Sequence, residues 1–142
     1  MMTMKLGKFC TAGLTAIALC LASAQQVLAD RRSISPGASV TVSGTSGGTS
    51  NSGDCGWVAA EPNLVLDATE DLLNMRIAVQ TAGAPTLLIE GPAGRYCVLP
   101  ETPSGSTVQF SGYGPRGTYN IYVGDRQQAQ HPYTLSVSDP QR

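Results

Sequence analysis

The sequence predicts an all-β protein, a two-sheet antiparallel sandwich of jelly-roll type, and three observations support this prediction. Short segments with alternating apolar and polar residues recur about every ten residues, and the clearest of them is Gly117–Asp125. Glycine or proline separates nearly all of these segments, as expected for tight turns between strands. No segment after residue 29 has the 3.6-residue period of an amphipathic helix. A small closed barrel is the alternative architecture.

The expected strands are short and follow one another along the chain. In order, they cover residues 38–44, 55–58, 63–67, 73–80, 86–90, 95–99, 108–110, 117–125 and 133–138. Residues 73–80 alternate most strictly, which predicts one buried face on this strand. That face would consist of Leu73, Met75, Ile77 and Val79. Residues 86–90 are almost continuously apolar, which is typical of a central strand covered on both faces.

Residues 1–29 have the features of a secretory signal peptide. Two lysines precede an apolar stretch of about a dozen residues, which is too short to span a bilayer. Cleavage after Ala29 would leave a single domain over residues 30–142, and residues 22–24 offer a second cleavage site. Within this domain, the glycine- and serine-rich residues 43–53 are expected to form a flexible loop. An uncleaved anchor and a lipoprotein lipidated at Cys20 are the alternatives. The protein is therefore expected to be exported, either to the periplasm or out of the cell.

Charge and composition narrow the range of partners. Cleavage after Ala29 leaves 113 of the 142 residues and removes both lysines, so seven arginines face ten acidic residues. The resulting net charge of about −3 argues against nucleic acid and against anionic membrane surfaces as partners. No transmembrane segment is expected after cleavage, because no later stretch approaches the required length.

The mature chain would keep two cysteines, Cys55 and Cys97. In an oxidising compartment, two thiols predict one disulfide. Closing a loop of this length stabilises a fold by roughly 4 kcal/mol in the chain-entropy model. A redox or metal-binding pair is the alternative, but neither cysteine lies in a CxxC motif, and the single histidine, His131, is distant in sequence.

Four segments resemble the bacterial pre-peptidase C-terminal domain, an exported β-sandwich that is often attached to secreted proteases. They are residues 46–48 before Cys55-Gly56, residues 85–94, residues 117–124 and residues 133–135. The resemblance implies a β-sandwich that serves as a module and not as an enzyme. No protease domain is recognisable in this sequence, so the module is expected to stand alone.

Calcium binding is a weaker prediction. Some members of that family carry acidic residues directly after a cysteine in the strand that follows the Gly-Pro turn. Here Val98 and Leu99 occupy that place, and neither can bind a hard cation. The remaining calcium candidates are Asp67, Glu70 and Asp71, for which a solvated acidic turn is the alternative interpretation. We therefore expect no metal and no cofactor.

No catalytic motif is recognisable. The chain lacks a Walker loop, an HExxH motif and a G-x-S-x-G motif, and His131 is expected in an exposed polar loop. Three aromatic residues, Trp57, Tyr113 and Tyr122, are candidates for a binding face that stacks on a sugar or an extended polypeptide. Ordinary packing at the rim of the sandwich is the alternative interpretation for them.

The sequence therefore predicts an exported, non-catalytic β-sandwich that binds or stabilises a polypeptide or another macromolecule. The partner would be a protein or polysaccharide of the cell envelope or the extracellular matrix. The alternatives are a purely structural envelope domain, a carbohydrate-binding module and a small secreted hydrolase that uses carboxylates.

Overall fold

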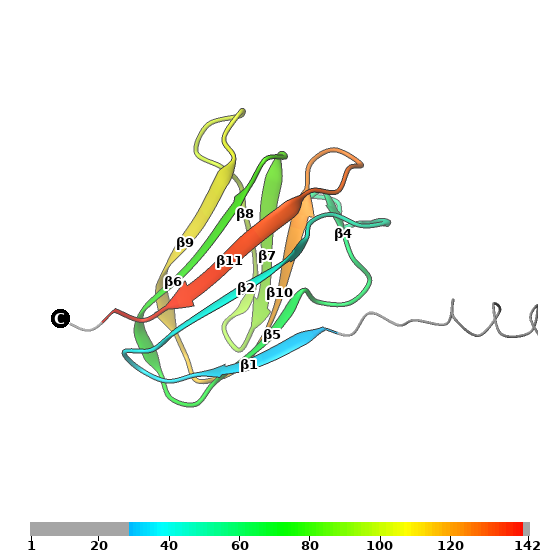
Figure 1. The fold of residues 1–142 in the computed structure, drawn as a ribbon. Coiled ribbons are helices and arrows are strands. Elements are labelled where there is room, and N and C mark those ends of the chain that lie inside the picture. Colours follow the sequence, from blue (N-terminus) through cyan, green and yellow to red (C-terminus); the bar gives the residue numbers. More distant parts are fainter. Residues whose placement is uncertain (1–28, 141–142) are drawn as a thin grey trace, which may run out of the picture.

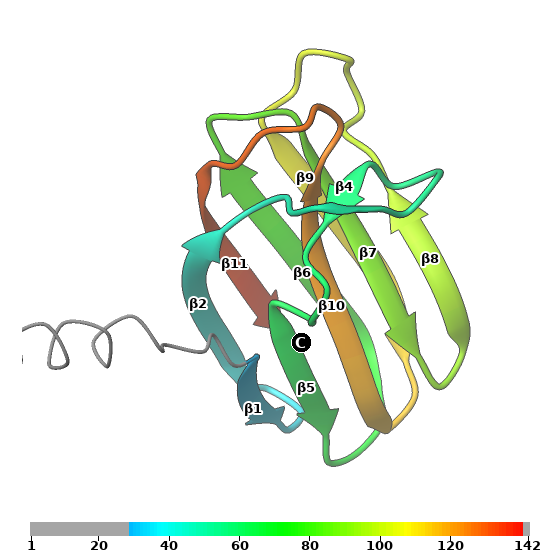
Figure 2. The same ribbon diagram turned by 90° about the vertical axis from the view of Figure 1, so that its right-hand side faces the viewer.

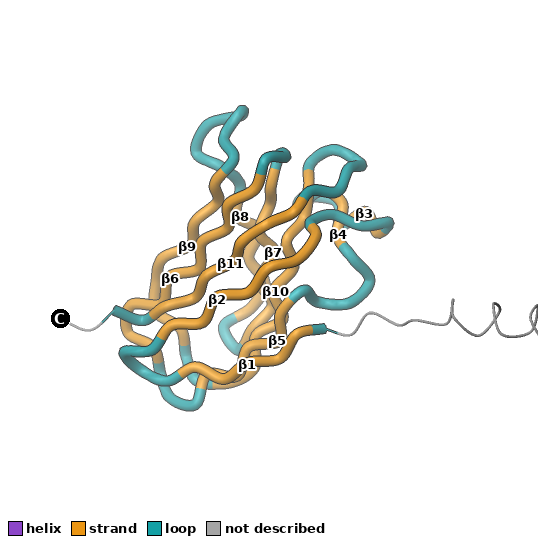
Figure 3. Tube along the Cα trace, viewed as in Figure 1, coloured by secondary structure: helices purple, strands orange, loops and turns teal. Residues whose placement is uncertain are grey.

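Eleven β-strands form the regular structure of residues 29–140, the part of the chain that the computed structural model describes. They are β1 (Asp30–Ile34), β2 (Ser39–Thr45), β3 (Ser50–Asn51), β4 (Trp57–Val58), β5 (Leu64–Ala68), β6 (Leu72–Thr81), β7 (Pro85–Gly91), β8 (Gly94–Val98), β9 (Thr107–Gly114), β10 (Gly117–Asp125) and β11 (Pro132–Ser138). Figure 3 shows these strands joined only by loops and turns. The predicted signal peptide, residues 1–29, lies outside the described range except for its last residue. Within residues 29–140, no helix has the length and apolar character needed to cross a membrane.

The strands form two sheets that face each other (Figures 1 and 2). The smaller sheet has the order β2-β11-β6-β9 and is antiparallel throughout. In the larger sheet, β5, β10, β7 and β8 are neighbours in that order, and β3 and β4 lie at one end of β10. With β1, β3 and β4, the larger sheet has seven strands, and the other eight strands of the described residues interleave between the two sheets as in a jelly roll, which confirms the predicted fold class.

β1 departs from the prediction in two ways. It was not expected to be a strand, because residues 30–34 are mostly polar, and it pairs with β5 in a parallel manner. Only Ile34 at its end is buried in the core, so the segment carries almost no apolar periodicity. Its place in the sheet is set by backbone hydrogen bonds to an edge strand, which a sequence pattern does not reveal.

The core lies between the two sheets and is built from the inward-facing residues of each strand. Its largest fully buried side chains include Leu64, Leu66, Leu87, Ile89, Ile121 and Leu135. Tyr119 and Tyr133 also face inward, as the alternation predicts. Two facing sheets hide every second side chain from water, and this burial is the main driving force for the fold.

The expected buried face of β6 is correct at three positions and wrong at Leu73. Met75, Ile77 and Val79 are buried, but Leu73 is 70% exposed and Leu72 is buried in its place. The pairing between β6 and β9 shifts register between Leu72 and Met75. Such an irregularity adds a residue to one strand, so the alternation before it moves to the opposite face.

The glycine- and serine-rich range 43–53, which the sequence predicts to be one flexible loop, contains regular structure. β2 continues to Thr45, and β3 occupies Ser50–Asn51. Ser46 is fully buried, and its N–H donates to the carbonyl of His131 at 2.8 Å. Small polar residues form these ladder contacts through their backbones, without the apolar alternation by which strands are recognised. The loop proper is therefore limited to residues 46–49 and 52–53.

A second, smaller hydrophobic cluster lies on the outer face of the larger sheet. It contains Cys55, Val58 and Leu88, with Cys97 and Tyr122 packed against it. Leu88 and Tyr122 pair across β7 and β10, and their side chains lie on the face opposite the inward-facing Ile89 and Ile121. The segment around β3 and β4 covers this face, so part of the sheet is buried on both sides.

Candidate functional site

A groove with a volume of about 850 Å³ lies beside the C-terminal half of β2. Its walls are residues 43–45 of β2, residues 59–63 of the β4–β5 connection, Gln130 and Tyr133, and Ala29 and Asp30 lie at its rim. β1 and β2 diverge from the turn that joins them (Figure 1), and residues of both strands line the groove. The groove thus lies where the edges of the two sheets separate.

Tyr133 forms the floor of the groove, and Gly44 makes room for it. The two residues are direct cross-strand partners in β11 and β2. A Cβ atom on Gly44 would lie 2.7 Å from the Tyr133 hydroxyl oxygen, closer than real Cβ contacts allow. Glycine is therefore needed where the backbone of β2 passes over the ring. Burial raises the pKa of Tyr133 above its ordinary value.

Asn63 closes one end of the groove by joining the two sheets. Its backbone N–H donates to the carbonyl of Ile121, and its Oδ1 accepts the N–H of Val123 at 2.8 Å. Its Nδ2 donates to the carbonyl of Thr45 at 3.3 Å. One side chain thus bridges β10 of the larger sheet and β2 of the smaller one. The sequence pattern does not reveal this role, because the partners of the Asn63 side chain are distant in sequence.

The rim of the groove is acidic. Asp30 and Glu61 line it, and no lysine or arginine does. Asp30 accepts a hydrogen bond from Nε of Arg32 at 3.1 Å, on the exposed side of β1. Glu61 is exposed and forms no ion pair with any residue of the described range. With alanine, proline and glycine in the walls, the groove combines an apolar lining with one carboxylate at its opening, Glu61, that forms no ion pair within the described range, whereas Asp30 is paired with Arg32.

The three candidate aromatic residues do not share one surface. Tyr113 is 55% exposed on the outer side of β9, whose inward-facing residues include Val108. Tyr122 lies on the outer face of the other sheet and packs against the disulfide cluster, and Trp57 lies in the short β4 beside Asp125. Tyr113 and Tyr122 therefore face opposite sides of the sandwich, and one stacking platform containing all three is not present.

The three calcium candidates are also not brought together as ligands. Asp67 is bound to Arg31 at 3.0 Å and to the Thr118 hydroxyl at 2.9 Å. Asp71 accepts the backbone N–H of Arg116, a bond that lowers the pKa of this carboxyl. Glu70 is exposed. Within residues 29–140, no three His, Cys, Asp or Glu side chains lie close enough together to hold a metal ion.

His131 is not the free loop histidine that the sequence suggests. Its Nδ1 lies 3.2 Å from Oδ2 of Asp125, whose side chain is 1% exposed. Asp125 also accepts the backbone N–H groups of Gln127 and Ala84. A carboxylate that accepts Nδ1–H fixes the orientation of an imidazole ring. Here the pair holds the β10–β11 connection beside a cavity of about 320 Å³ that Ser104 and Arg126 also line.

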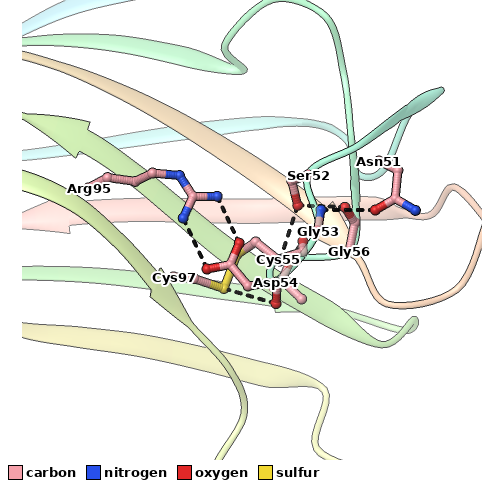
Figure 4. Close-up of a disulfide and its surroundings, with 9 residues drawn as sticks. Asn51, Ser52, Gly53, Asp54, Cys55, Gly56, Arg95 and Cys97 are labelled. Carbon is pink, nitrogen blue, oxygen red and sulfur yellow. Dashed lines mark hydrogen bonds and ion pairs between the residues drawn. A yellow bond between two sulfur atoms is a disulfide. The ribbon is translucent and has the colours of Figure 1, made fainter.

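The predicted disulfide between Cys55 and Cys97 is present, with a Cα–Cα distance of 5.6 Å. Figure 4 shows the ion pair next to it, in which both terminal nitrogens of Arg95 contact the Asp54 carboxylate at 3.0 and 2.8 Å. The hydrogen bond from Arg95 holds the pKa of Asp54 below its ordinary value. Both contacts fasten the β3–β4 segment to β8 at the edge of the larger sheet.

Comparison with known proteins begins with sequence. No family model matches the chain. An uncharacterised protein of Synechococcus elongatus is 44% identical over 101 residues, which cover 68% of this chain and 73% of that protein. The chain belongs to the same family as this cyanobacterial protein. Their shared region is long enough to contain most of the sandwich.

Comparison of structures places this family member among pre-peptidase C-terminal-like folds. The pre-peptidase C-terminal domain of a collagenase from Bacillus anthracis matches with a TM-score of 0.53 at 17% identity, over 80% of this chain and all of that domain. The predicted resemblance is thus confirmed for the fold. A weaker match, with a TM-score of 0.36 and 16% identity, is PliG of Aeromonas hydrophila, a periplasmic inhibitor of g-type lysozyme.

Proposed function

We propose that this protein is an exported, non-catalytic β-sandwich module that binds a polypeptide in the groove beside β2. The groove is the observation that carries the proposal. Its volume of about 850 Å³ falls within the range of ligand sites in proteins, which is roughly 300–1,000 Å³. Its apolar lining and charged rim match the common arrangement of such sites, in which apolar walls supply contact area and a few polar groups supply orientation.

Export is supported by the covalent link between Cys55 and Cys97, because disulfides persist mainly in oxidising compartments. The lysine-flanked apolar stretch near the start of the sequence supports the same location. Periplasm and extracellular space are both consistent with these features.

A polypeptide fits the groove better than a polysaccharide does. Sugar-binding surfaces commonly stack aromatic rings on the sugar, but the groove has one aromatic residue, Tyr133, and only 5% of it is exposed. The exposed Tyr113 lies on the outer face of β9 in the smaller sheet, whereas Tyr122 lies on the outer face of the larger sheet. The groove instead presents the backbone of β2 and the acidic side chain of Glu61, which are suited to peptide groups and charged side chains.

Site-specific photo-cross-linking tests this function. A benzoyl-phenylalanine at Gln130, which is exposed at the groove, should capture a polypeptide from the exported fraction of the native cells. The same group at Gln80, exposed on β6, is the matched control and should capture much less. Equal capture at both positions, or capture at neither, would contradict a binding role for the groove and favour the purely structural alternative.

A further inference from the structure

The edges of the two sheets differ in how well they are protected against pairing with another strand. Natural sheets protect their edges with charges, prolines, bulges or covering segments. β1 carries Asp30, Arg31 and Arg32, which form exposed ion pairs. β8 carries Arg95, which binds Asp54, and it is cross-linked through Cys97 to the segment that covers the neighbouring strands.

The two edges of the smaller sheet also differ from each other. Neither β2 nor β9 contains a charged residue or a proline. β9, however, contacts β7 and β8 of the other sheet, and Phe110 lies with its ring 6.0 Å from that of Tyr96 on β8. β9 is therefore partly closed off by the opposite layer. The C-terminal half of β2 borders the open groove instead.

The free edge of β2 presents backbone N–H and C=O groups that point away from β11. Successive residues of a strand point their N–H and C=O groups to alternate edges. The N–H of Ser46 donates toward β11, to His131, whereas the carbonyl of Thr45 accepts the Asn63 side chain on the opposite side. Thr41 and Ser43 share the direction of Thr45, and their backbone groups have no hydrogen-bond partner among the described residues.

A strand added along this edge would lie over the groove. Residues 43–45 form one wall, and β2 turns Val42 and Gly44 inward, toward the core and Tyr133. The inward-facing side chains of an added strand would therefore enter the groove. Long side chains with an aliphatic stem and a cationic tip suit it best, because the stem would contact the apolar walls and the tip would reach the carboxylate of Glu61.

A second copy of this chain fits the edge poorly. The sequence of β2, Ser-Val-Thr-Val-Ser-Gly-Thr, contains no basic residue to offer the acidic rim. Each copy would also bring a Glu61 carboxylate to the shared edge, and charges of like sign disfavour such a contact. The charge of the groove therefore favours a different chain.

From these observations we propose that the partner is a basic, extended polypeptide that pairs as an extra strand with the free edge of β2 and inserts a lysine or arginine into the groove. The proposal rests on the proposed function and adds the mode of binding and the chemistry of the partner. Strand addition to a sheet edge is a recurrent mode of peptide recognition, in which backbone hydrogen bonds supply affinity and alternate side chains supply specificity.

Synthetic peptides test both parts of the proposal on the unaltered, exported protein. The probe is a labelled octapeptide of alternating valine and threonine with one central lysine, measured by fluorescence anisotropy. Replacing the lysine by glutamate should weaken binding by about tenfold, since the acidic rim would then repel the side chain. N-methylation of alternate peptide nitrogens, which removes strand hydrogen bonds, should also weaken it by about tenfold. Equal affinity of the methylated peptide would overturn strand addition, and equal affinity of the glutamate peptide would overturn the basic partner.

Two pairs of variants locate the binding. Ser43→Pro removes a backbone N–H that faces the free edge, a position where proline is tolerated. It should weaken binding of the lysine peptide about tenfold, whereas Ser43→Ala should leave this binding unchanged. Glu61→Gln should reduce the preference for lysine over norleucine by about threefold, with Glu101→Gln as an exposed control outside the groove. Circular dichroism checks that each variant is folded. Unchanged binding by a folded Ser43→Pro protein would overturn the assignment to β2.

The outcomes separate this inference from the proposed function. If the Gln130 photo-cross-link persists in the Ser43→Pro protein while the peptides fail to bind, the groove binds a polypeptide in another way and only the inference fails. If both the cross-link and the peptides fail, the proposed function fails as well. A dimer that dissociates on introduction of Ser43→Pro, seen by analytical ultracentrifugation, would assign the edge to a second copy and overturn the basic partner.

Discussion

The edge strands on the two sides of the sandwich, β8 and β2, differ in how they are protected against pairing with another strand. On one side, β8 is fixed by the Cys55–Cys97 disulfide and by the ion pair between Asp54 and Arg95. On the other side, β2 has uncharged, short side chains and borders a groove of about 850 Å³. Proteins that leave a long edge unprotected risk unwanted pairing, and the proposed binding mode gives the open edge of β2 a purpose.

Under the proposed function, the two sides differ in what they contribute, one to stability and the other to binding. The disulfide side carries a second hydrophobic cluster, in which Leu88 and Tyr122 are covered by the β3–β4 segment. On the β2 side, the layers are linked by hydrogen bonds of Asn63 and by the N–H of Gly47, which donates to the carbonyl of Val123, and the groove has a buried tyrosine under a glycine. Changes on the first side should therefore act on folding, and changes on the second side on binding.

The largest expected effect comes from removing the disulfide. The double variant Cys55→Ser and Cys97→Ser should lose about 2–5 kcal/mol of unfolding free energy, because the cross-link restricts the unfolded chain. Denaturant unfolding measures this loss. Hydrogen exchange should quicken in β8 and the β3–β4 segment before it does so in β2 and β11. Equal loss of protection on both sides of the sandwich would contradict the division between them.

A smaller effect is expected at Tyr119, which touches neither edge. Its hydroxyl donates to the carbonyl of Pro115 at the turn before β10, and its ring packs against Gly91, where a Cβ would lie only 2.4 Å from it. Such a bond resembles the tyrosine corner of other sandwiches. Tyr119→Phe should lose about 1 kcal/mol at pH 7 and leave peptide binding at β2 unchanged.

The same variant changes the response to alkali. Burial raises the pKa of Tyr119 to about 12, whereas the unfolded side chain ionises near 10. The stability linked to this group is therefore complete below pH 10 and is lost as the pH rises through 12. Tyr119→Phe should flatten that decline in unfolding free energy between pH 10 and 12. An identical alkaline slope in the two proteins would show that Tyr119 ionises as an exposed tyrosine does.

The smallest effect is expected at the exposed ion pair beside the disulfide. Because Arg95 lowers the pKa of Asp54, the pair stabilises the fold above pH 3.8 and loses this contribution as the pH falls through the lowered pKa. Asp54→Asn should therefore lower Tm slightly at pH 7, less at high salt, and hardly at all at the acid end. A loss as large as that of the disulfide variant would mean that the ion pair, and not the cross-link, holds β8.

Local pattern was enough for most of the fold. Strands such as 117–125 and 133–138 are recognisable because every second side chain is apolar, and the two remaining cysteines define their own pairing. The pattern failed where backbone pairing alone makes a strand, as in β1, and where a register shift exchanges Leu73 for Leu72. Neither effect leaves a periodic signal in the sequence.

The candidate site was far less predictable. The aromatic prediction identified Tyr113 and Tyr122 as exposed or partly exposed, but the layer to which each belongs depends on strand order. Asn63 and Gly44 were overlooked because a turn asparagine and a strand glycine are common and gain their roles only from what lies opposite. His131 was expected in an exposed loop, because the spacing of His131 and Asp125 in the sequence does not indicate a contact. Their contact is visible only in the tertiary structure.

The sequence by itself determined an all-β sandwich, its alternating core and its single cross-link, because each of these depends on the residue type at a position and on neighbours close along the chain. Only the tertiary structure decided which edge stays open, which layer carries each tyrosine, and that β2, residues 59–63 and Tyr133 enclose one groove. These features depend on contacts between strands that are distant in sequence, and a jelly roll brings such strands together through its crossing connections.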